Sequence, residues 1–418
     1  MSRERTVVGI DVGTTKVCTL IGEVSRSGNI NVIGVGVSPS RGMRKGMVVN
    51  IGEAVEAIGQ SVERAQRVSG FKVVSAYVGI AGNHVMSLNS RGFVAVSHTD
   101  RTIDDEDVAR AIEASQVINI PSNREIIHAI PRHFIVDGQE GIRNPVGMLG
   151  YRLDVETHIV TGATTAIQNL KKCIHQLGID VDEIVLEPLA SSEAALTEEE
   201  KEMGVVLVDI GGGTTDLAIF IDGSAWHTGV ISVGGRNITY DIASRLRTPM
   251  HEAEELKIQY GRATVDGVSP DELIEVATFG GNQVQSVPRI QICEVIQDRL
   301  VETFQLIDAE IKRSGYDGLL PAGLVLTGGT AETAGIVELA SECLQLPVRI
   351  GTPNRIHGLT DLVQSPAYTT SIGLLVWGAR GGERAVEARA RRIERRASRE
   401  HGMTMTGRLV NWLKTFLP

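Results

Sequence analysis

The sequence predicts an α/β protein with two similar lobes and one inserted α+β subdomain. Several apolar, β-branched runs end in glycine-rich turns, at 7–15, 205–216 and 324–331. Each run has the pattern of a buried strand followed by a tight turn. Amphipathic helical patterns lie between these strands. The first two strand–turn segments resemble each other at an interval of about 200 residues, which is too long for a solenoid repeat and indicates two facing halves.

The composition is that of a globular, acidic protein. The chain has 418 residues with 41 basic and 51 acidic side chains, a net charge of −10. An acidic balance argues against a nucleic-acid partner. The four cysteines lie far apart and form neither a zinc nor a disulfide pattern. No signal-peptide core and no apolar run of about 18 residues is present, so we expect neither secretion nor a membrane span.

Five segments carry the apolar periodicity of helices facing a core. In the first of them Val55, Ile58, Val62 and Ala65 share one face, and Gly70 ends the pattern. The predicted helices cover residues 52–70, 104–118, 165–179, 248–261 and 293–315.

Two regions depart from this alternation of strands and helices. Between 84 and 162 the chain has short strand-like pieces, such as 91–97 and 132–138, which indicate an inserted α+β subdomain. From 381 the composition becomes strongly charged, with seven Arg and four Glu in residues 381–402. We expect this region to be a solvated linker.

The first glycine-rich turn, DVGTTK at 11–16, has the residue types of a phosphate loop. Gly13 lets the backbone approach a ligand, and the hydroxyls of Thr14 and Thr15 can face phosphate oxygens. Asp11 is a suitable ligand for Mg²⁺, directly or through water. Lys16 can neutralise phosphate charge. Gly-Thr-Thr turns are common, however, and this motif alone favours a purely structural turn.

The second turn, DIGGGTTD at 209–216, is more specific. Three consecutive glycines would destabilise an ordinary hairpin, whereas a turn folded over a phosphate chain needs them. Asp209 would be a second metal-facing carboxylate, matching Asp11. The predicted phosphate-binding residues of this turn are Gly211, Gly212, Gly213, Thr214 and Thr215. Two such loops on facing lobes would hold one triphosphate from both sides.

A third turn, LTGGTA at 326–331, places Gly328 and Gly329 between a strand and a helical pattern. A Gly-Gly pair there lets a base or ribose lie against the backbone. The sequence has no GxGxxG motif at its N-terminal strand and no GxxxxGK[ST] motif. A Rossmann dinucleotide site and a P-loop are therefore disfavoured.

The order DxGTTK, DxGGGTTD, TGG resembles the actin, Hsp70 and sugar-kinase ATPase superfamily, with its phosphate 1, phosphate 2 and adenosine motifs. Residues 186–196 are similar to its connecting helix, which implies that Glu187 positions the attacking water. EAEELK at 252–257 resembles its E-x-x-K adenosine segment, which implies that Glu254 and Lys257 contact the nucleotide. Without the resemblance, the spacing of Glu254 and Lys257 would indicate only an exposed ion pair on a helix.

This resemblance implies an actin-like fold with ATP and Mg²⁺ in the cleft between the lobes. In-line attack by water needs positioning and charge neutralisation. The sequence shows no pocket for a hydroxyl substrate, so phosphate transfer to a small molecule has no support. Slow hydrolysis or a nucleotide-dependent conformational switch fits better.

The last twelve residues, 407–418, form an amphipathic pattern. Its apolar face consists of Leu409, Trp412, Leu413, Phe416 and Leu417. Such a helix suits the lipid–water interface, and the alternative is a helix docked on the protein's own core. Residues 381–418 carry a net charge of +5 against −15 for the rest of the chain, which favours adsorption of the tail to an anionic membrane.

Across nearly the whole chain the sequence resembles the FtsA family of bacterial actin homologues. The family-specific segments are RGMRKGMVVNI at 41–51 and HAIPRHFIVDGQEGIRNPVGM at 128–148. The resemblance implies a protein that forms head-to-tail filaments and anchors the FtsZ ring to the cytoplasmic face of the membrane at the septum. It also implies recruitment of later divisome proteins, and docking of the C-terminal peptide of FtsZ near Arg299 and Glu302, which otherwise read as an exposed charged pair.

The same resemblance implies a division into subdomains. The predicted limits are 1–83, 163–198 and 361–380 for 1A, 84–162 for the inserted 1C, 199–235 and 316–360 for 2A, 236–315 for 2B, 381–406 for the linker and 407–418 for the membrane helix.

Other members of the superfamily remain as alternatives. A sugar kinase would need a sugar pocket with a catalytic Asp in the cleft, and the sequence suggests none. An Hsp70 chaperone would need a substrate-binding domain after residue 380, where only 38 residues follow. A type IV pilus assembly ATPase would lack the amphipathic tail.

Overall fold

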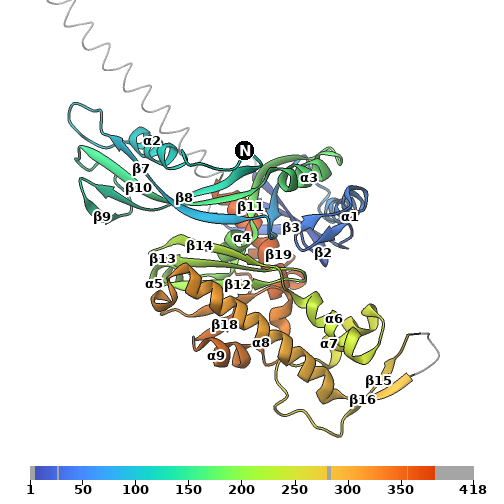
Figure 1. The fold of residues 1–418 in the computed structure, drawn as a ribbon. Coiled ribbons are helices and arrows are strands. Elements are labelled where there is room, and N and C mark those ends of the chain that lie inside the picture. Colours follow the sequence, from blue (N-terminus) through green and yellow to red (C-terminus); the bar gives the residue numbers. More distant parts are fainter. Residues whose placement is uncertain (1–4, 26–27, 280–283, 355, 382–418) are drawn as a thin grey trace, which may run out of the picture.

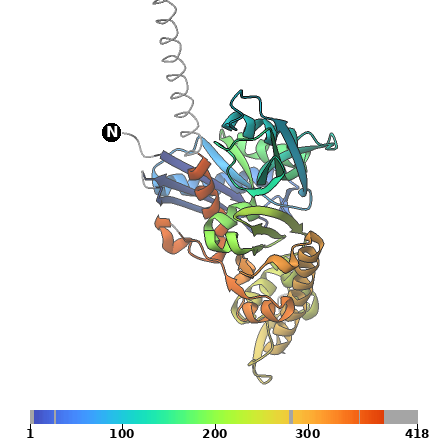
Figure 2. The same cartoon turned by 90° about the vertical axis from the view of Figure 1, so that its left-hand side faces the viewer.

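The computed structural model has the predicted α/β fold in two lobes (Figures 1 and 2). It describes residues 5–25, 28–279, 284–354 and 356–381. We call residues 5–80, 164–196 and 356–381 lobe 1, residues 205–350 lobe 2, and residues 86–163 the inserted subdomain. The beginning and the end of the described chain meet in lobe 1, where the guanidinium of Arg5 donates to the carbonyl of Gly378 at 2.8 Å.

Lobe 1 is built on a six-stranded sheet with the order β11-β6-β1-β2-β3-β19. One face packs on α1 and α3, and the other on α4 and the helix over residues 369–381. The elements are β1 Arg5–Val12, β2 Lys16–Val24, β3 Ile30–Pro39, the hairpin β4 Met43–Arg44 and β5 Met47–Val48, α1 Ile51–Ser69, β6 Ser75–Ile80, α3 Thr164–His175, β11 Asp180–Leu186, α4 Glu187–Ala195 and β19 Ile356–Gly358.

Lobe 2 has a five-stranded sheet with the order β14-β13-β12-β17-β18. Helices α8 and α9 pack on one face, and α6 and α7 pack against α8. A hairpin, β15–β16, projects at the far end of the lobe (Figure 1). The elements are α5 Glu198–Met203, β12 Val205–Ile210, β13 Thr215–Ile221, β14 Ser224–Ile231, α6 Gly235–Leu246, α7 Met250–Tyr260, β15 Leu273–Ala277, β16 Val284–Pro288, α8 Arg289–Ser314, β17 Leu324–Thr327, α9 Ile336–Leu344 and β18 Val348–Ile350.

The two lobes repeat one hairpin, as the sequence predicts. In lobe 1 the antiparallel hairpin β1–β2 pairs Val12 with Val17, and β1 runs parallel to β6. In lobe 2 the hairpin β12–β13 pairs Ile210 with Thr215, and β12 runs parallel to β17. The two glycine–threonine turns therefore lie at equivalent ends of equivalent strands.

The inserted subdomain is a four-stranded antiparallel sheet, β7-β10-β8-β9, with α2 packed on it. Three of its strands, β7, β8 and β10, are longer than the short pieces expected from the sequence. Pro131 lies where the pairing of β8 with β10 shifts register, and this irregularity divides the alternating pattern of β8 into two shorter stretches. The elements are β7 Met86–Ala95, α2 Asp105–Ser115, β8 Arg124–Val136, β9 Gln139–Ile142 and β10 Arg152–Ala163.

Helix ends follow local signals. The side chain of Asn50 caps α1 by accepting from the amide of Glu53, and Gly70 ends the helix at φ 68°. The five predicted helices are confirmed, with shifted ends. Helix α8 begins at Arg289, directly after Pro288, rather than at 293. The helical pattern predicted after residue 330 splits into a 3₁₀ turn, Gly329–Glu332, and α9.

The helix over residues 369–381 is fixed to its neighbours at its C-terminal end. Arg380 forms ion pairs with Glu193 of α4 and Glu198 of α5. Glu193 also pairs with the buried Lys201 at 3.1 Å. This network ties the end of the described chain to both helices.

Phe304 on α8 is fully buried in the core of lobe 2, whereas Leu306 on the same helix is 38% exposed. We expect Phe304→Ala to lower the free energy of unfolding by about 3–5 kcal/mol, because it removes buried apolar surface and leaves a cavity. Leu306→Ala should change it by no more than about 1 kcal/mol. Urea unfolding followed by circular dichroism measures both, and equal losses would contradict this packing.

Candidate functional site

A cavity of about 790 Å³ lies between the lobes at the turns of the two repeated hairpins. It collects nearly all of the predicted nucleotide residues, which lie as much as 318 positions apart in the chain. Those that line it are Asp11, Gly13, Thr14, Thr15, Lys16, Glu187, Asp209, Gly211, Gly212, Gly213, Thr214, Glu254, Lys257, Gly328 and Gly329.

Thr215 is the predicted residue that does not line this cavity. Its hydroxyl instead donates to the carbonyl of Val233 at 2.9 Å. Side chains alternate along β13, so Thr215 faces away when its neighbours Thr214 and Asp216 face the cavity. Asp216, which was not among the predicted residues, is therefore the residue that β13 contributes to the cavity.

The turns of the two lobes touch each other, which explains the run of glycines. A Cβ on Gly213 would lie 2.6 Å from the hydroxyl of Thr14, and one on Gly212 would overlap the hydroxyl of Thr15. Any side chain at these positions would push the turns apart. On its other side Thr14 accepts from the amide of Gly46, in the loop between β4 and β5, at 3.3 Å.

Hydroxyl groups hold the two predicted metal-facing carboxylates. Asp11 accepts from Ser371 at 2.9 Å. Asp209 accepts from Ser191 and Thr370, both at 2.9 Å. Ser191 belongs to α4, and Thr370 and Ser371 to the helix over residues 369–381. None of these three hydroxyls was predicted from the sequence. The Thr-Thr-Ser run at 369–371, directly before the apolar residues 372–377, was the available signal for two of them.

Four carboxyl groups are buried together here. Burial raises the pKa of Asp11 to about 6, against the opposing charge of Lys16. Burial, reinforced by the charge of Asp209, raises the pKa of Asp216 to about 8. Burial and three neighbouring carboxylates raise the pKa of Glu187 well above its usual value, and burial also raises that of Asp209. Such a cluster favours a bound cation.

One atom of this cluster points to a metal ion. Oδ1 of Asp216 is buried and has no hydrogen-bond partner among the described residues. An unpaired carboxylate oxygen beside other carboxylates is costly unless a cation or water completes it. Oxygen ligands of this kind are those that Mg²⁺ prefers, so the residues fit a magnesium ion.

Lys16 connects the first turn to the end of the chain. Its ammonium donates to the carbonyl of Ala367 at 2.5 Å and lies 3.6 Å from the ring centroid of Tyr368. Both residues directly precede the helix that carries Thr370 and Ser371. The positive charge of Lys16 therefore lies at the edge of the carboxylate cluster.

The opposite wall of the cavity comes from α6, α7 and the turn after β17. Lys257 pairs with Glu254 at 2.8 Å and donates to Thr239 at 3.0 Å. Gly328 has φ 87°, and a Cβ there would overlap a carboxylate oxygen of Asp209. Only glycine fits this turn, which brings Gly328 and Gly329 next to the second phosphate loop.

Comparison with known sequences identifies the family. A profile described as "Cell division protein FtsA" matches residues 206–373, and one described as "SHS2 domain inserted in FTSA" matches residues 82–161. Cell division protein FtsA of Pseudomonas aeruginosa is 47% identical over 372 residues, which cover 89% of each chain. The chain belongs to the FtsA family of cell division proteins. The FtsA of Bacillus subtilis is 40% identical, over 91% of this chain and 85% of that one.

Solved structures show that this FtsA-family chain has the fold of the actin-like ATPases. The PilM–PilN type IV pilus biogenesis complex matches with a TM-score of 0.65 and 16% identity, over 90% of this chain and 99% of that chain. MreB5 of Spiroplasma citri bound to ADP matches with a TM-score of 0.53 and 15% identity, over 93% and 98%. The predicted fold class is thereby confirmed.

The residues that FtsA resemblance assigns to FtsZ docking lie apart from the cavity between the lobes. Arg299 on α8 pairs with Asp241 of α6 at 2.6 Å and with Glu302 at 2.5 Å. These side chains line a shallow hollow of about 310 Å³. The predicted membrane residues, 409–417, lie outside the described residues. Within the described ranges, no helix has the length and apolar character needed to cross a bilayer.

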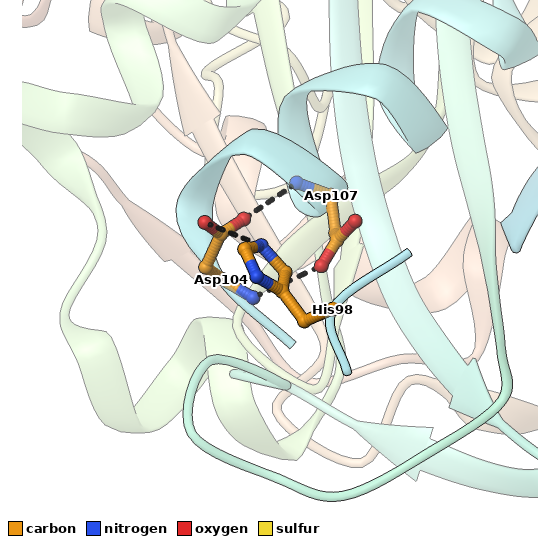
Figure 3. A group of neighbouring side chains, drawn as sticks. All are labelled: His98, Asp104 and Asp107. Carbon is orange, nitrogen blue, oxygen red and sulfur yellow. Dashed lines mark hydrogen bonds and ion pairs between the residues drawn. The ribbon is translucent and has the colours of Figure 1, made fainter. Parts of the chain in front are cut away.

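A second group of potential metal ligands lies in the inserted subdomain (Figure 3). It consists of His98, Asp104 and Asp107, and helix capping explains its geometry. Asp104 accepts from the amide of Asp107 at 3.0 Å, and Asp107 accepts from the amide of Asp104 at 3.2 Å. Asp107 also pairs with Arg110. These carboxylates therefore serve the first turn of α2.

The raised pKa values predict how stability depends on pH. A carboxyl whose pKa is higher in the folded than in the unfolded state contributes stability below the unfolded pKa, and this is lost as pH rises through the folded pKa. With folded pKa values of about 6 for Asp11 and about 8 for Asp216, the melting temperature in EDTA should fall between about pH 4 and about pH 8. Asp216→Asn should flatten this decrease.

Thermal melts over this pH range check the prediction. The exposed Asp266→Asn is the matched control and should leave the slope as in the wild type. A slope that Asp216→Asn leaves unchanged would mean that Asp216 does not titrate as its burial requires.

Proposed function

We propose that the chain binds ATP and Mg²⁺ between its lobes, forms head-to-tail filaments and anchors the FtsZ ring to the cytoplasmic face of the membrane during division. The observation that carries the nucleotide site is the direct contact of the two repeated turns beside four buried carboxyl groups. Turns that meet across two lobes hold a ligand only while the lobes are closed, so the nucleotide would govern lobe closure.

Each group around the cavity has a task that its position supports. Backbone amides of both turns and the hydroxyls of Thr14 and Thr214 would face the phosphates. Lys16 would lie against their negative charge. Asp11 and Asp209, already held by hydroxyls, would bind Mg²⁺ directly or through water, and this ion would supply positive charge beside the phosphates. Glu254 and Lys257 would contact the adenosine.

Glu187 is the group that would position the attacking water. It lies at the first position of α4 and lines the cavity. Burial holds the pKa of this carboxyl well above its usual value. From this position it can orient a water molecule in the cavity. We propose a weak ATPase, in which the nucleotide acts mainly as a switch.

The role in division extends the family assignment. The apolar face of residues 409–417 would enter an anionic bilayer, so the protein would be a peripheral membrane protein at the septum. The hollow at Arg299 and Glu302 would receive the C-terminal peptide of FtsZ. Subdomain 1C would serve the recruitment of later divisome proteins. No nucleic-acid partner is proposed.

The contact of the turns predicts how ATP binding fails. Gly213→Ala should raise the Kd for Mg–ATP at least about tenfold, because the new Cβ separates the turns and overpacking at such a site costs about 1–3 kcal/mol. Gly318→Ala is the control, since a Cβ there meets no atom within 4 Å. Calorimetry with Mg–ATP measures both. No ATP binding by the wild type would refute the proposal.

The residues at 409–417 and the hollow at Arg299 should affect vesicle flotation differently: the first should control membrane binding and the second FtsZ binding. The double variant Trp412→Asp, Phe416→Asp should lose binding to anionic vesicles, because charge is placed on the apolar face. Thr415→Ala, on the polar face, should float like the wild type. Arg299→Glu should still float but should carry at least about tenfold less FtsZ, since it reverses the charge of a side chain that lines the hollow. Equal flotation of all variants would exclude the tether.

A further inference from the structure

A histidine of the inserted subdomain reaches the start of the connecting helix α4. His128 lies on β8 and is almost completely buried. Its Nε2 accepts a hydrogen bond from the backbone amide of Leu186 at 3.0 Å. Leu186 is the last residue of β11, and the next residue is Glu187, the first of α4. The inserted subdomain thus contacts the backbone one residue away from the cavity between the lobes.

The chemistry of this contact determines the state of the ring. A backbone amide only donates, so Nε2 must be the unprotonated nitrogen and Nδ1 must carry the proton. Burial lowers the pKa of His128 to about 4, which keeps the ring neutral. Nδ1 lies 3.9 Å from a carboxylate oxygen of Glu183. The side chain at 128 therefore acts as a fixed acceptor.

The surroundings prevent the ring from turning away. The ring of Trp377 packs at a centroid distance of 5.3 Å. The indole nitrogen of Trp377 donates to Glu183 at 3.1 Å. Glu183 and Trp377 thus hold each other beside the imidazole, and His128 has little freedom to leave the amide of Leu186.

The inserted subdomain is itself held against lobe 2, so β8 is a firm support. Nε2 of His158 on β10 and the hydroxyl of Thr228 on β14 share a hydrogen bond of 3.0 Å. The hydroxyl of Ser87 on β7 donates to the carbonyl of Thr228 at 2.8 Å. The guanidinium of Arg132, also on β8, lies 3.9 Å from the ring of Trp226. A residue on β8 is therefore held in place by a sheet that contacts both lobes.

The start of α4 has no cap of its own that could replace this contact. The N-cap residue, Leu186, has no side chain that can accept a hydrogen bond, and proline follows Glu187. The side chain of Glu187 lies over Gly79 of β6, where a Cβ would be only 3.4 Å from its Cγ. A small shift of the backbone at Leu186 would therefore move the carboxyl within the cavity.

We propose that His128 is a positioning residue for the nucleotide reaction, holding the start of α4 so that Glu187 stands at the correct place for the attacking water. This inference rests on the proposed ATP site and assigns the inserted subdomain a part in it. Displacement of a reacting or orienting group by about 1 Å can cost about 100-fold in rate. The loss should appear in turnover and not in ATP affinity.

The test compares two replacements of His128 in the full-length protein. Leu has a similar volume but no acceptor, whereas the amide oxygen of Gln can stand near the place of Nε2. We expect His128→Leu to lower the single-turnover rate of Mg–ATP hydrolysis at least about tenfold with a Kd within about twofold of the wild type, and His128→Gln to restore most of the rate. His133→Leu, on the same strand, is the matched control.

A double-mutant cycle separates positioning from a general loss of structure. If His128 acts through Glu187, Glu187→Gln should remove most of the effect of His128→Leu, so that the two losses are not additive. Additive losses, or parallel losses of affinity and melting temperature in the Leu and Gln variants alike, would overturn the inference. A wild type that binds Mg–ATP but does not turn it over would also overturn it, leaving the ATP site intact, whereas absent binding would refute the ATP site itself.

Discussion

The close approach of two glycine–threonine turns, one from each lobe, is the constraint on which the rest of the structure depends. Gly212 and Gly213 lie against Thr15 and Thr14 so tightly that no side chain fits between them. This contact closes the lobes around a buried group of carboxyls, which repel one another when they are charged. The hydroxyls of Ser191, Thr370 and Ser371 offset part of that repulsion, and Oδ1 of Asp216 remains without a protein partner.

Local sequence was enough to predict the parts of the site that local chemistry controls. The turns at 11–16 and 209–216 are fixed by glycine and threonine at defined positions after buried strands, and the buried face of α8 follows from its apolar spacing. The predictions that failed concern how the elements face one another in the folded chain. Which of Thr214, Thr215 and Asp216 faces the cavity depends on where β13 begins, because a shift of one residue exchanges the two faces of a strand.

Contacts between distant segments could not be read from the sequence at all. Ser371 and Asp11 are 360 positions apart, and His128 and Leu186 are 58 apart. Nothing in the neighbouring residues marks a serine or a histidine as the partner of a remote group. The long strands of the inserted subdomain were equally hidden, since the irregular pairing at Pro131 interrupts the alternation that would have revealed β8.

The helix over residues 369–381 connects the cavity carboxylates, His128 and the ion pairs with α4 and α5. Thr370 and Ser371 at its start hold the cavity carboxylates, Trp377 packs on His128, and Arg380 at its end is paired with α4 and α5. A force on the chain after residue 381 would first reach Arg380 and its partners in α4 and α5. The same helix would carry this force to Thr370 and Ser371, which hold the cavity carboxylates.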